Sequence, residues 1–156
     1  MPKPSEPLLR AARATDAEAI ARVMRAAFLS FGWMPMLHTP EGDLLFIKDV
    51  LSQKRVIVAE ADNELIGFIA VGGEWVEQLY LDPRWTGKGI GSRLLDEAIA
   101  TLPVVRLYCF QANSGARRFY ERHGFRAELF GDGSKNQEGL PDILYVRSVA
   151  AASPGA

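Results

Sequence analysis

Cysteine, histidine and long apolar runs are scarce in this 156-residue sequence, and each scarcity excludes a class of protein. Cys109 is the only cysteine, so no disulfide can form within the chain. The two histidines, His38 and His123, lie far apart without the spacing of metal ligands, so we expect no metal site. No apolar run approaches the roughly 20 residues that span a bilayer, so we expect no membrane partner.

The charge balance argues against a nucleic-acid partner. Lysine and arginine number 18, aspartate and glutamate 19, and the formal net charge is −1, which leaves no strongly basic domain. Hydrophobic residues make up 48% and charged residues 24%, as in ordinary soluble globular proteins. The opening "MPKPSEP" lacks the apolar core of a signal peptide, which predicts a cytoplasmic location.

The chain reads as one domain. We find no internal repeat, no low-complexity block and no linker, and the length suits a single domain. The two ends of the sequence consist largely of small residues and proline and show no hydrophobic periodicity. We therefore predict one domain over 7–149, with flexible tails at 1–6 and 150–156.

Four helices are predicted from periodicity and capping signals. Thr15 followed by Glu18 forms a capping box, and apolar residues then recur at helical spacing as far as Phe31. Thr39 and Pro40 begin a second helix that runs to about residue 52. The third helix turns inward Ile90, Leu94, Leu95, Ala98 and Leu102, and the fourth runs from Asn113 to a closing Gly124.

Seven strands are predicted from runs rich in β-branched and aromatic residues. Asp62-Asn63 separates two of them in the pattern of a tight hairpin. The strand ranges are 8–13, 55–61, 64–72, 74–81, 104–110, 125–131 and 142–148. The element order β-α-α-β-β-β-α-β-α-β-β predicts a mixed α/β fold, with a mostly antiparallel central sheet flanked by helices, because the middle strands lack helical crossovers.

Three glycines lie within five positions, between the run "VEQLYL" and the third helix. Backbone amides at the start of a helix have no hydrogen-bond partner within the helix, and they bind anions, usually phosphate. A Walker A loop is excluded because Gly89, not a serine or threonine, follows Lys88. A dinucleotide fingerprint is excluded because Ser92 stands where its third glycine would be. The amides from Gly87 to Ser92 still predict a concavity suited to a pyrophosphate.

The pattern Arg84-x-x-Gly87-x-Gly89, continued by Ile90-Gly91, resembles the acyl-CoA signature of the Gcn5-related N-acetyltransferase (GNAT) family. The resemblance includes the preceding "LYLDP" and the later "ARRFYERHGF", and the element order is similar from 8 to 148. It implies the GNAT fold, acetyl-CoA as co-substrate, and direct transfer of the acetyl group to an amine on a small molecule or peptide.

The resemblance also implies a role for each matching residue. Tyr120 aligns with the general acid that protonates the departing CoA thiolate, and the side chain of Asn113 would hold the pantetheine arm. The backbone of the strand before the loop would pair with that arm. The residues implied to bind acetyl-CoA are Leu79, Tyr80, Leu81, Arg84, Gly87, Lys88, Gly89, Ile90, Gly91, Ser92 and Asn113.

A general base is useful because an amine substrate arrives protonated. Glu77 is the first candidate, since strand alternation places it on the face of Trp75 and Leu79, where it would be partly desolvated. Glu74 and His38 follow. The alternative for Glu77 is an ordinary solvated or ion-paired strand glutamate.

Several alternatives stay open at this point. Arg84 either contacts phosphate or only fixes the loop, Lys88 either adds a charge to the site or is solvated, and Asn113 is also a plausible helix cap. The acceptor is unspecified; the segments 28–39 and 131–141 are expected to form its walls. A catalytically silent acetyl-CoA sensor is the alternative function, and another acyl group such as succinyl is a second one. The oligomeric state is open, including a homodimer.

Overall fold

The computed structural model describes residues 6–149 as two compact units, each with its own packed interior. The N-terminal unit comprises the described chain up to Gly72 together with Glu77–Ala100. The C-terminal unit comprises Gly73–Val76 and the chain from Thr101 onward. Except for Glu6, which is exposed, the residues predicted as flexible tails lie outside the described residues. The single domain over 7–149 stays a prediction.

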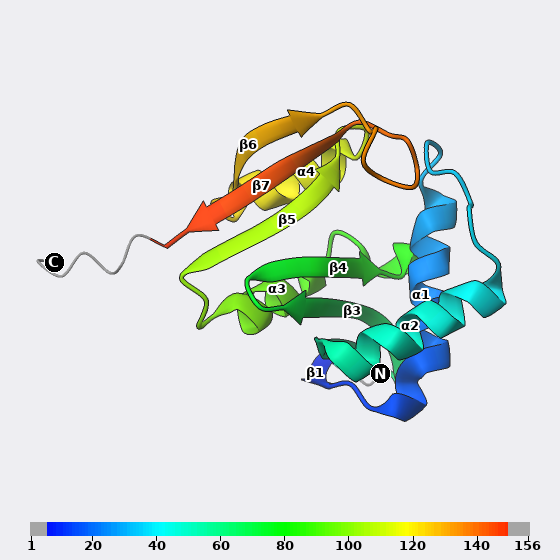
Figure 1. The fold of residues 1–156 in the computed structure, drawn as a ribbon. Helices are drawn as coiled ribbons and strands as arrows, with labels where there is room; N and C mark the ends of the chain where they lie inside the picture. Colours follow the sequence, from blue (N-terminus) through cyan, green and yellow to red (C-terminus); the bar gives the residue numbers. More distant parts are fainter. Residues whose placement is uncertain (1–5, 150–156) are drawn as a thin grey trace, which may run out of the picture. The chain divides into compact units, whose positions relative to one another are not determined.

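The N-terminal unit holds three helices, two short 3₁₀ turns and most of the first four strands (Figure 1). In chain order these elements are β1 (Leu8–Ala11), η1 (Ala14–Asp16), α1 (Ala17–Ser30), α2 (Pro40–Gln53), β2 (Arg55–Ala61), β3 (Glu64–Gly72), β4 (Trp75–Leu81), η2 (Pro83–Trp85) and α3 (Ile90–Ile99). The first two residues of β4 belong to the C-terminal unit.

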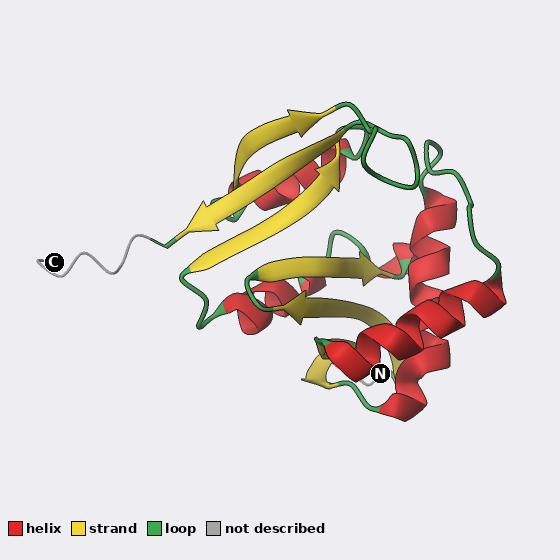
Figure 2. Cartoon of the chain, viewed as in Figure 1, coloured by secondary structure: helices red, strands yellow, loops and turns green. Residues whose placement is uncertain are grey.

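The C-terminal unit holds one helix and three whole strands, and Figure 2 colours both units by secondary structure. Its elements are β5 (Val104–Phe110), α4 (Ser114–Arg122), β6 (Arg126–Gly131) and β7 (Asp142–Ser148). The strands pair in the order β1-β2-β3-β4-β5-β7-β6. Trp75 pairs with Arg106 in a parallel bridge, whereas β1-β2, β2-β3, β5-β7 and β6-β7 are antiparallel. The predicted mixed, mostly antiparallel sheet flanked by helices is confirmed, as is the order of helices and strands.

In the N-terminal unit, helices cover both faces of β2 and β3, which explains why these strands are almost continuously buried. Val58 and Phe68 point toward α1 and α2, where Ile20, Met24 and Ile47 complete a packed cluster. The alternate residues of β2 and β3 turn toward α3, which packs on both strands. Burial of this kind contributes roughly 25 cal/mol per Å² of apolar surface and holds α3 in place.

In the C-terminal unit, α4 covers one face of the β5-β7-β6 sheet (Figure 1). Every second residue of β5 and β7 is buried toward this helix, including Leu107, Cys109 and Tyr145. Phe125 is buried there too, just after α4. The intervening residues, such as Tyr108, are exposed or half-buried on the other face.

Two predicted helix boundaries are wrong. The Thr15 capping box does not form, because residues 14–16 make a 3₁₀ turn and α1 begins only after Asp16. The third helix ends at Ile99 and does not include Leu102. Pro103 explains this end, because the residue before a proline is disfavoured in helical geometry.

Two local signals are confirmed. The Thr39 hydroxyl accepts a hydrogen bond from the Gly42 amide at 3.0 Å, and Pro40 is the first residue of α2. Asp62 and Asn63 have φ of 53° and 63°, the left-handed pair that a two-residue hairpin requires. Among the described residues, no helix combines the length and apolar character needed to cross a membrane.

A carboxylate–guanidinium cluster joins β1, η1 and β2. Arg10 donates to both carboxylate oxygens of Asp16, at 2.8 and 2.9 Å, and also contacts Glu60. The Asp16 side chain is only 13% exposed and also accepts from the Arg13 amide at 2.7 Å. The hydrogen bonds from Arg10 lower the pKa of Asp16 from 3.8 to about 2, although burial opposes this shift.

We expect Asp16→Asn to lower the free energy of unfolding by up to about 2 kcal/mol at neutral pH. A depressed carboxyl pKa stabilises the fold above the unfolded value of 3.8, and this contribution is lost as pH falls toward 2. Urea titrations at pH 7, 4 and 2.5 should therefore show that the difference in the free energy of unfolding between wild type and variant becomes smaller as the pH falls. Glu97→Gln, on the exposed side of α3, is the control, and its free energy of unfolding should equal that of wild type at every pH.

Candidate active site

The glycine loop connects β4 to α3 through two left-handed residues. Gly87 has φ of 76° and Gly89 has φ of 83°, and α3 begins at Ile90. Gly89 is the N-cap of α3, and no side chain caps the helix there. Ile90 and Leu94 are buried beneath the first turn, so the start of the helix is held firmly. The N-cap residue therefore offers no side-chain acceptor to the first amides of α3.

The space around the two left-handed glycines is open. A β-carbon built on Gly87 or Gly89 would meet no atom within 4 Å. Their backbone angles, and not crowding by neighbours, account for glycine here. Gly91 lies in the first turn of α3 and is buried.

Arg84 is held by two carboxylates. Its guanidinium lies 2.8 Å from Asp82 and 2.8 Å from Glu64, at the start of β3. Hydrogen bonds to both carboxylates raise the pKa of Arg84, and the bond to Asp82 has the larger effect. The hydrogen bond from Arg84 in turn lowers the pKa of Asp82. These contacts fix the loop, and a contact of Arg84 with phosphate stays a prediction.

Lys88 and the strand before the loop have aromatic neighbours. The Lys88 ammonium lies 5.9 Å from the centre of the Trp85 ring, and Lys88 is exposed. Leu79, Tyr80 and Leu81 are half-buried, and the Tyr80 ring packs edge-on against Phe28 at 5.1 Å. This packing directs the Tyr80 side chain into the unit, so β4 would offer a ligand its backbone and not this ring.

The three candidate bases differ in their surroundings. Glu77 is 36% exposed and forms an ion pair with Lys54 at 3.3 Å, so the ion-paired alternative describes its observed contact. Glu74 pairs with Arg106 at 2.7 Å. His38 is exposed, and its backbone carbonyl accepts from Arg25. Glu77 thus stands in a charged, half-solvated setting and not in an apolar one.

Asn113 and Tyr120 lie in the C-terminal unit. The Asn113 side chain caps α4 by accepting from the Ala116 amide at 3.1 Å. Tyr120 is buried, at 9% exposure, between the rings of Phe125 at 5.5 Å and Tyr145 at 6.4 Å. The loop of residues 84–92 and Glu77 belong to the N-terminal unit.

A hydrogen-bonded network lies beside Tyr120. The Tyr145 hydroxyl donates to Glu121 at 2.6 Å and accepts from the Arg117 guanidinium at 3.3 Å. Burial, reinforced by the Glu121 contact, raises the pKa of Tyr145. The network ties the middle of α4 to β7 and so fixes the residues around Tyr120.

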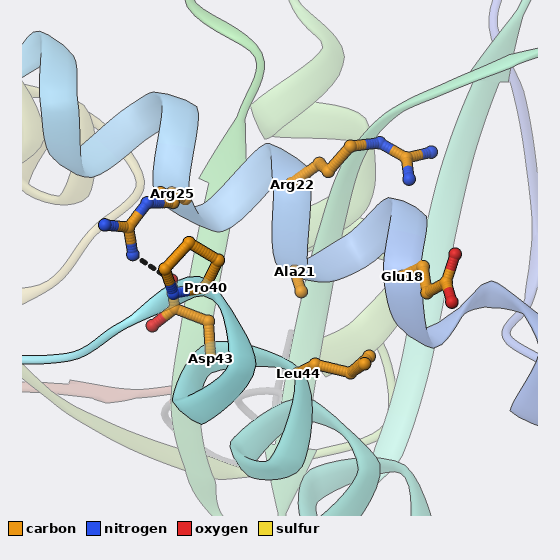
Figure 3. A pocket seen from close by; sticks show the side chains of 7 residues that line it. All are labelled: Glu18, Ala21, Arg22, Arg25, Pro40, Asp43 and Leu44. Atoms are coloured by element: carbon orange, nitrogen blue, oxygen red, sulfur yellow. Dashed lines mark hydrogen bonds and ion pairs between the residues drawn. The ribbon is translucent and has the colours of Figure 1, made fainter.

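Sequence reasoning missed two features. One is the set of side chains that hold the glycine loop in place, and the other is a pocket. Asp82 precedes Pro83 and caps η2 through the Arg84 amide at 2.9 Å, a signal that the Asp-Pro pair does carry. The pocket lies between α1 and the start of α2 and has a volume of about 190 Å³ (Figure 3). At one end Arg25 pairs with the buried Asp43 at 2.7 Å. Within residues 6–149, no group of His, Cys, Asp and Glu side chains is placed to hold a metal ion.

The geometry defines a mixed α/β protein in which a glycine loop with two left-handed residues leads directly into the start of α3. A family model described as "Acetyltransferase (GNAT) domain" matches residues 52–127. The peptidyl-lysine N-acetyltransferase YjaB of Salmonella typhimurium is 32% identical over 81 residues, 51% of this chain and 56% of that protein. An uncharacterized N-acetyltransferase of Archaeoglobus fulgidus is 31% identical over 109 residues, 58% of this chain and 74% of that protein.

The fold agrees with these relatives. YncA of Salmonella typhimurium, solved with its cofactor acetyl-CoA, superposes with a TM-score of 0.73 at 20% identity, over 92% of this chain and 94% of that one. This chain belongs to the GNAT acetyltransferase family. The matched segment spans about half, 56%, of the length of YjaB.

We expect Gly89→Ala to destabilise the protein by about 1 kcal/mol, because alanine is strained at positive φ even where space is free. Gly115 is the matched control: it lies in α4, its φ is not positive, and a β-carbon there would also meet no atom within 4 Å. Gly115→Ala should instead stabilise by about 0.5 kcal/mol. Urea unfolding measures both. Equal shifts for the two variants would show that Gly89 does not need its left-handed geometry.

Proposed function

We propose that the protein transfers an acetyl group from acetyl-CoA to a primary amine. The observation that carries this proposal is the uncapped start of α3, directly after two left-handed glycines. The amides from Gly87 to Ser92 would hold the pyrophosphate of CoA, assisted by the positive end of the helix. The acetyl-CoA of the YncA neighbour supports the choice of co-substrate.

The remaining contacts to acetyl-CoA are assigned from the family pattern. The backbone of Leu79, Tyr80 and Leu81 would pair with the pantetheine arm as a strand pairs with a sheet edge. Ile90 and Lys88 would flank the pyrophosphate. Asn113 uses its side-chain oxygen for the helix cap, so its two amide N–H donors are the groups left to hold a pantetheine carbonyl.

In the reaction, the amine nitrogen attacks the acetyl carbonyl carbon, the carbon–sulfur bond breaks, and the CoA thiolate takes a proton. Tyr120 would supply that proton. A thiol titrates near 8.5 and a phenol near 10, so the transfer is uphill by about 2 kcal/mol unless the site assists it. Glu77 would accept the proton of the arriving ammonium, which requires its ion pair with Lys54 to loosen.

We take the side chain of a peptide lysine as the first acceptor to test. The support is the name of the YjaB relative, a peptidyl-lysine N-acetyltransferase. A small-molecule amine is the alternative acceptor. A sensor that binds acetyl-CoA without turnover is the alternative function, and it differs in predicting binding without release of CoA for every amine.

The test is steady-state CoA release from acetyl-CoA with a lysine peptide, a free peptide N-terminus and small amines. Tyr120→Phe should lower kcat about 10²-fold, because it removes a general acid, with the calorimetric Kd for acetyl-CoA changed less than about twofold. Tyr108→Phe is the matched control, since this hydroxyl is exposed and lies outside the proposed site.

Gly89→Glu should abolish acetyl-CoA binding, because a carboxylate would repel the pyrophosphate. Gly89→Ala, which has the same backbone strain as Gly89→Glu but no negative charge, should still bind acetyl-CoA. Tight binding by wild type without release for any acceptor would favour the sensor. Absence of acetyl-CoA binding by folded wild type would refute the proposal.

We expect the thiol reagent used to follow CoA release to leave native protein unlabelled. Burial raises the pKa of Cys109 to about 12, so at pH 8 only about 0.01% is thiolate. Unfolding in guanidinium should expose one reactive thiol per chain. Rapid labelling of one equivalent in the native protein would contradict the observed burial of Cys109 at 6% exposure.

A further inference from the structure

Within the described part of the C-terminal unit, no helix covers the second face of the β5-β7-β6 sheet, the face opposite α4. The strand register aligns three apolar side chains across it: Tyr108 opposite Leu144, and Leu144 opposite Leu129. We name these three residues the apolar row. Tyr108 is 62% exposed and Leu129 61% exposed, and Trp75 stacks on Tyr108 with ring centres 5.5 Å apart.

A single exposed leucine or tyrosine needs no explanation, but a row of register neighbours does. Antiparallel sheets with one wet face normally carry polar residues there. Here the middle solvent-facing position of each of three adjacent strands is apolar, and β6 lies at the end of the strand order. A continuous apolar row beside a free sheet edge marks a surface for protein association.

Charges lie on both sides of the apolar row. On one side the register aligns Arg106, Val146 and Arg126, and on the other Phe110, Asp142 and Gly131. Arg106 is already paired with Glu74 at 2.7 Å. Among the ion pairs of residues 6–149, neither Arg126 nor Asp142 takes part, so each side of the row carries one charge without a counter-ion.

We propose that this face binds a second copy of the chain, related by a two-fold axis that runs along the apolar row. Such an axis lays the row of one copy against the row of the other and exchanges its two flanks. Across this axis Arg126 of each copy faces Gly131 of the other, and that copy's Asp142 lies one strand, about 4.8 Å, to the side, within reach of an arginine side chain. Each Arg126 then gains the partner's Asp142 as a counter-ion, twice in the dimer. An axis along the strands would instead place Arg126 over the partner's Arg106.

The proposed interface must be larger than the apolar row. A stable interface buries roughly 800 Å² on each partner, which the apolar row alone does not provide. The flanking rows, with Phe110 and Val146, and the stacked Trp75 extend the apolar area to both sides of the row. The proposal therefore requires face-to-face contact of the three strands and not contact of the β6 edges alone.

Sedimentation equilibrium of the full chain, from micromolar to several hundred micromolar, tests this proposal. Wild type should sediment as a dimer, and Leu129→Lys should weaken dimerisation at least about tenfold. Leu45→Lys is the matched control, since Leu45 is 69% exposed on α2 in the other unit. Far-UV circular dichroism confirms that each variant is folded.

A double-mutant cycle tests the axis. Arg126→Gln and Asp142→Asn should each weaken the dimer several-fold, and the double variant should be no weaker than either single variant, because the two residues serve one contact. Additive losses would overturn the proposed axis. A monomeric wild type, or a dimer that Leu129→Lys leaves intact, would overturn the proposed surface.

Discussion

The start of α3 is the constraint on which the proposed chemistry depends. A helix leaves its first amides without internal partners, and proteins usually satisfy one of them with a side-chain oxygen. Thr39 does this for α2 and Asn113 for α4. Gly89 has no side chain to offer, and its left-handed backbone places open space before the first turn. An anionic ligand is one way to satisfy these amides.

The residues assigned to the reaction are also structural residues, which sets limits on how each can act. Arg84 fixes the loop through Asp82 and Glu64, so its loss would disturb the loop even if it never touches phosphate. Tyr120 is enclosed by aromatic rings, which holds its orientation and also restricts access of water to its hydroxyl. Position and chemistry are therefore coupled in both units, and single substitutions need binding and stability readouts together.

The sequence predicts the fold well where a local signal determines a local shape. Asp62-Asn63 and Thr39-Pro40 each carry their geometry in a few residues, and both appear as expected. The Thr15 cap failed because Asp16 is drawn into a cluster with Arg10 and Glu60, a long-range contact that no local pattern encodes. The partners of Arg84 and Glu77 were missed for the same reason, since Glu64 and Lys54 are about 20 residues away in sequence.

The left-handed turn between β2 and β3 bears on how the chain folds. It closes two long strands through only two residues, so the loss of loop entropy on pairing them is small. The same strands carry Val58 and Phe68, which form the centre of the cluster with α1 and α2. Apolar contacts between segments near in sequence tend to form early, because they stabilise the chain before distant segments come into contact. We therefore expect this hairpin to form early in the folding of the N-terminal unit.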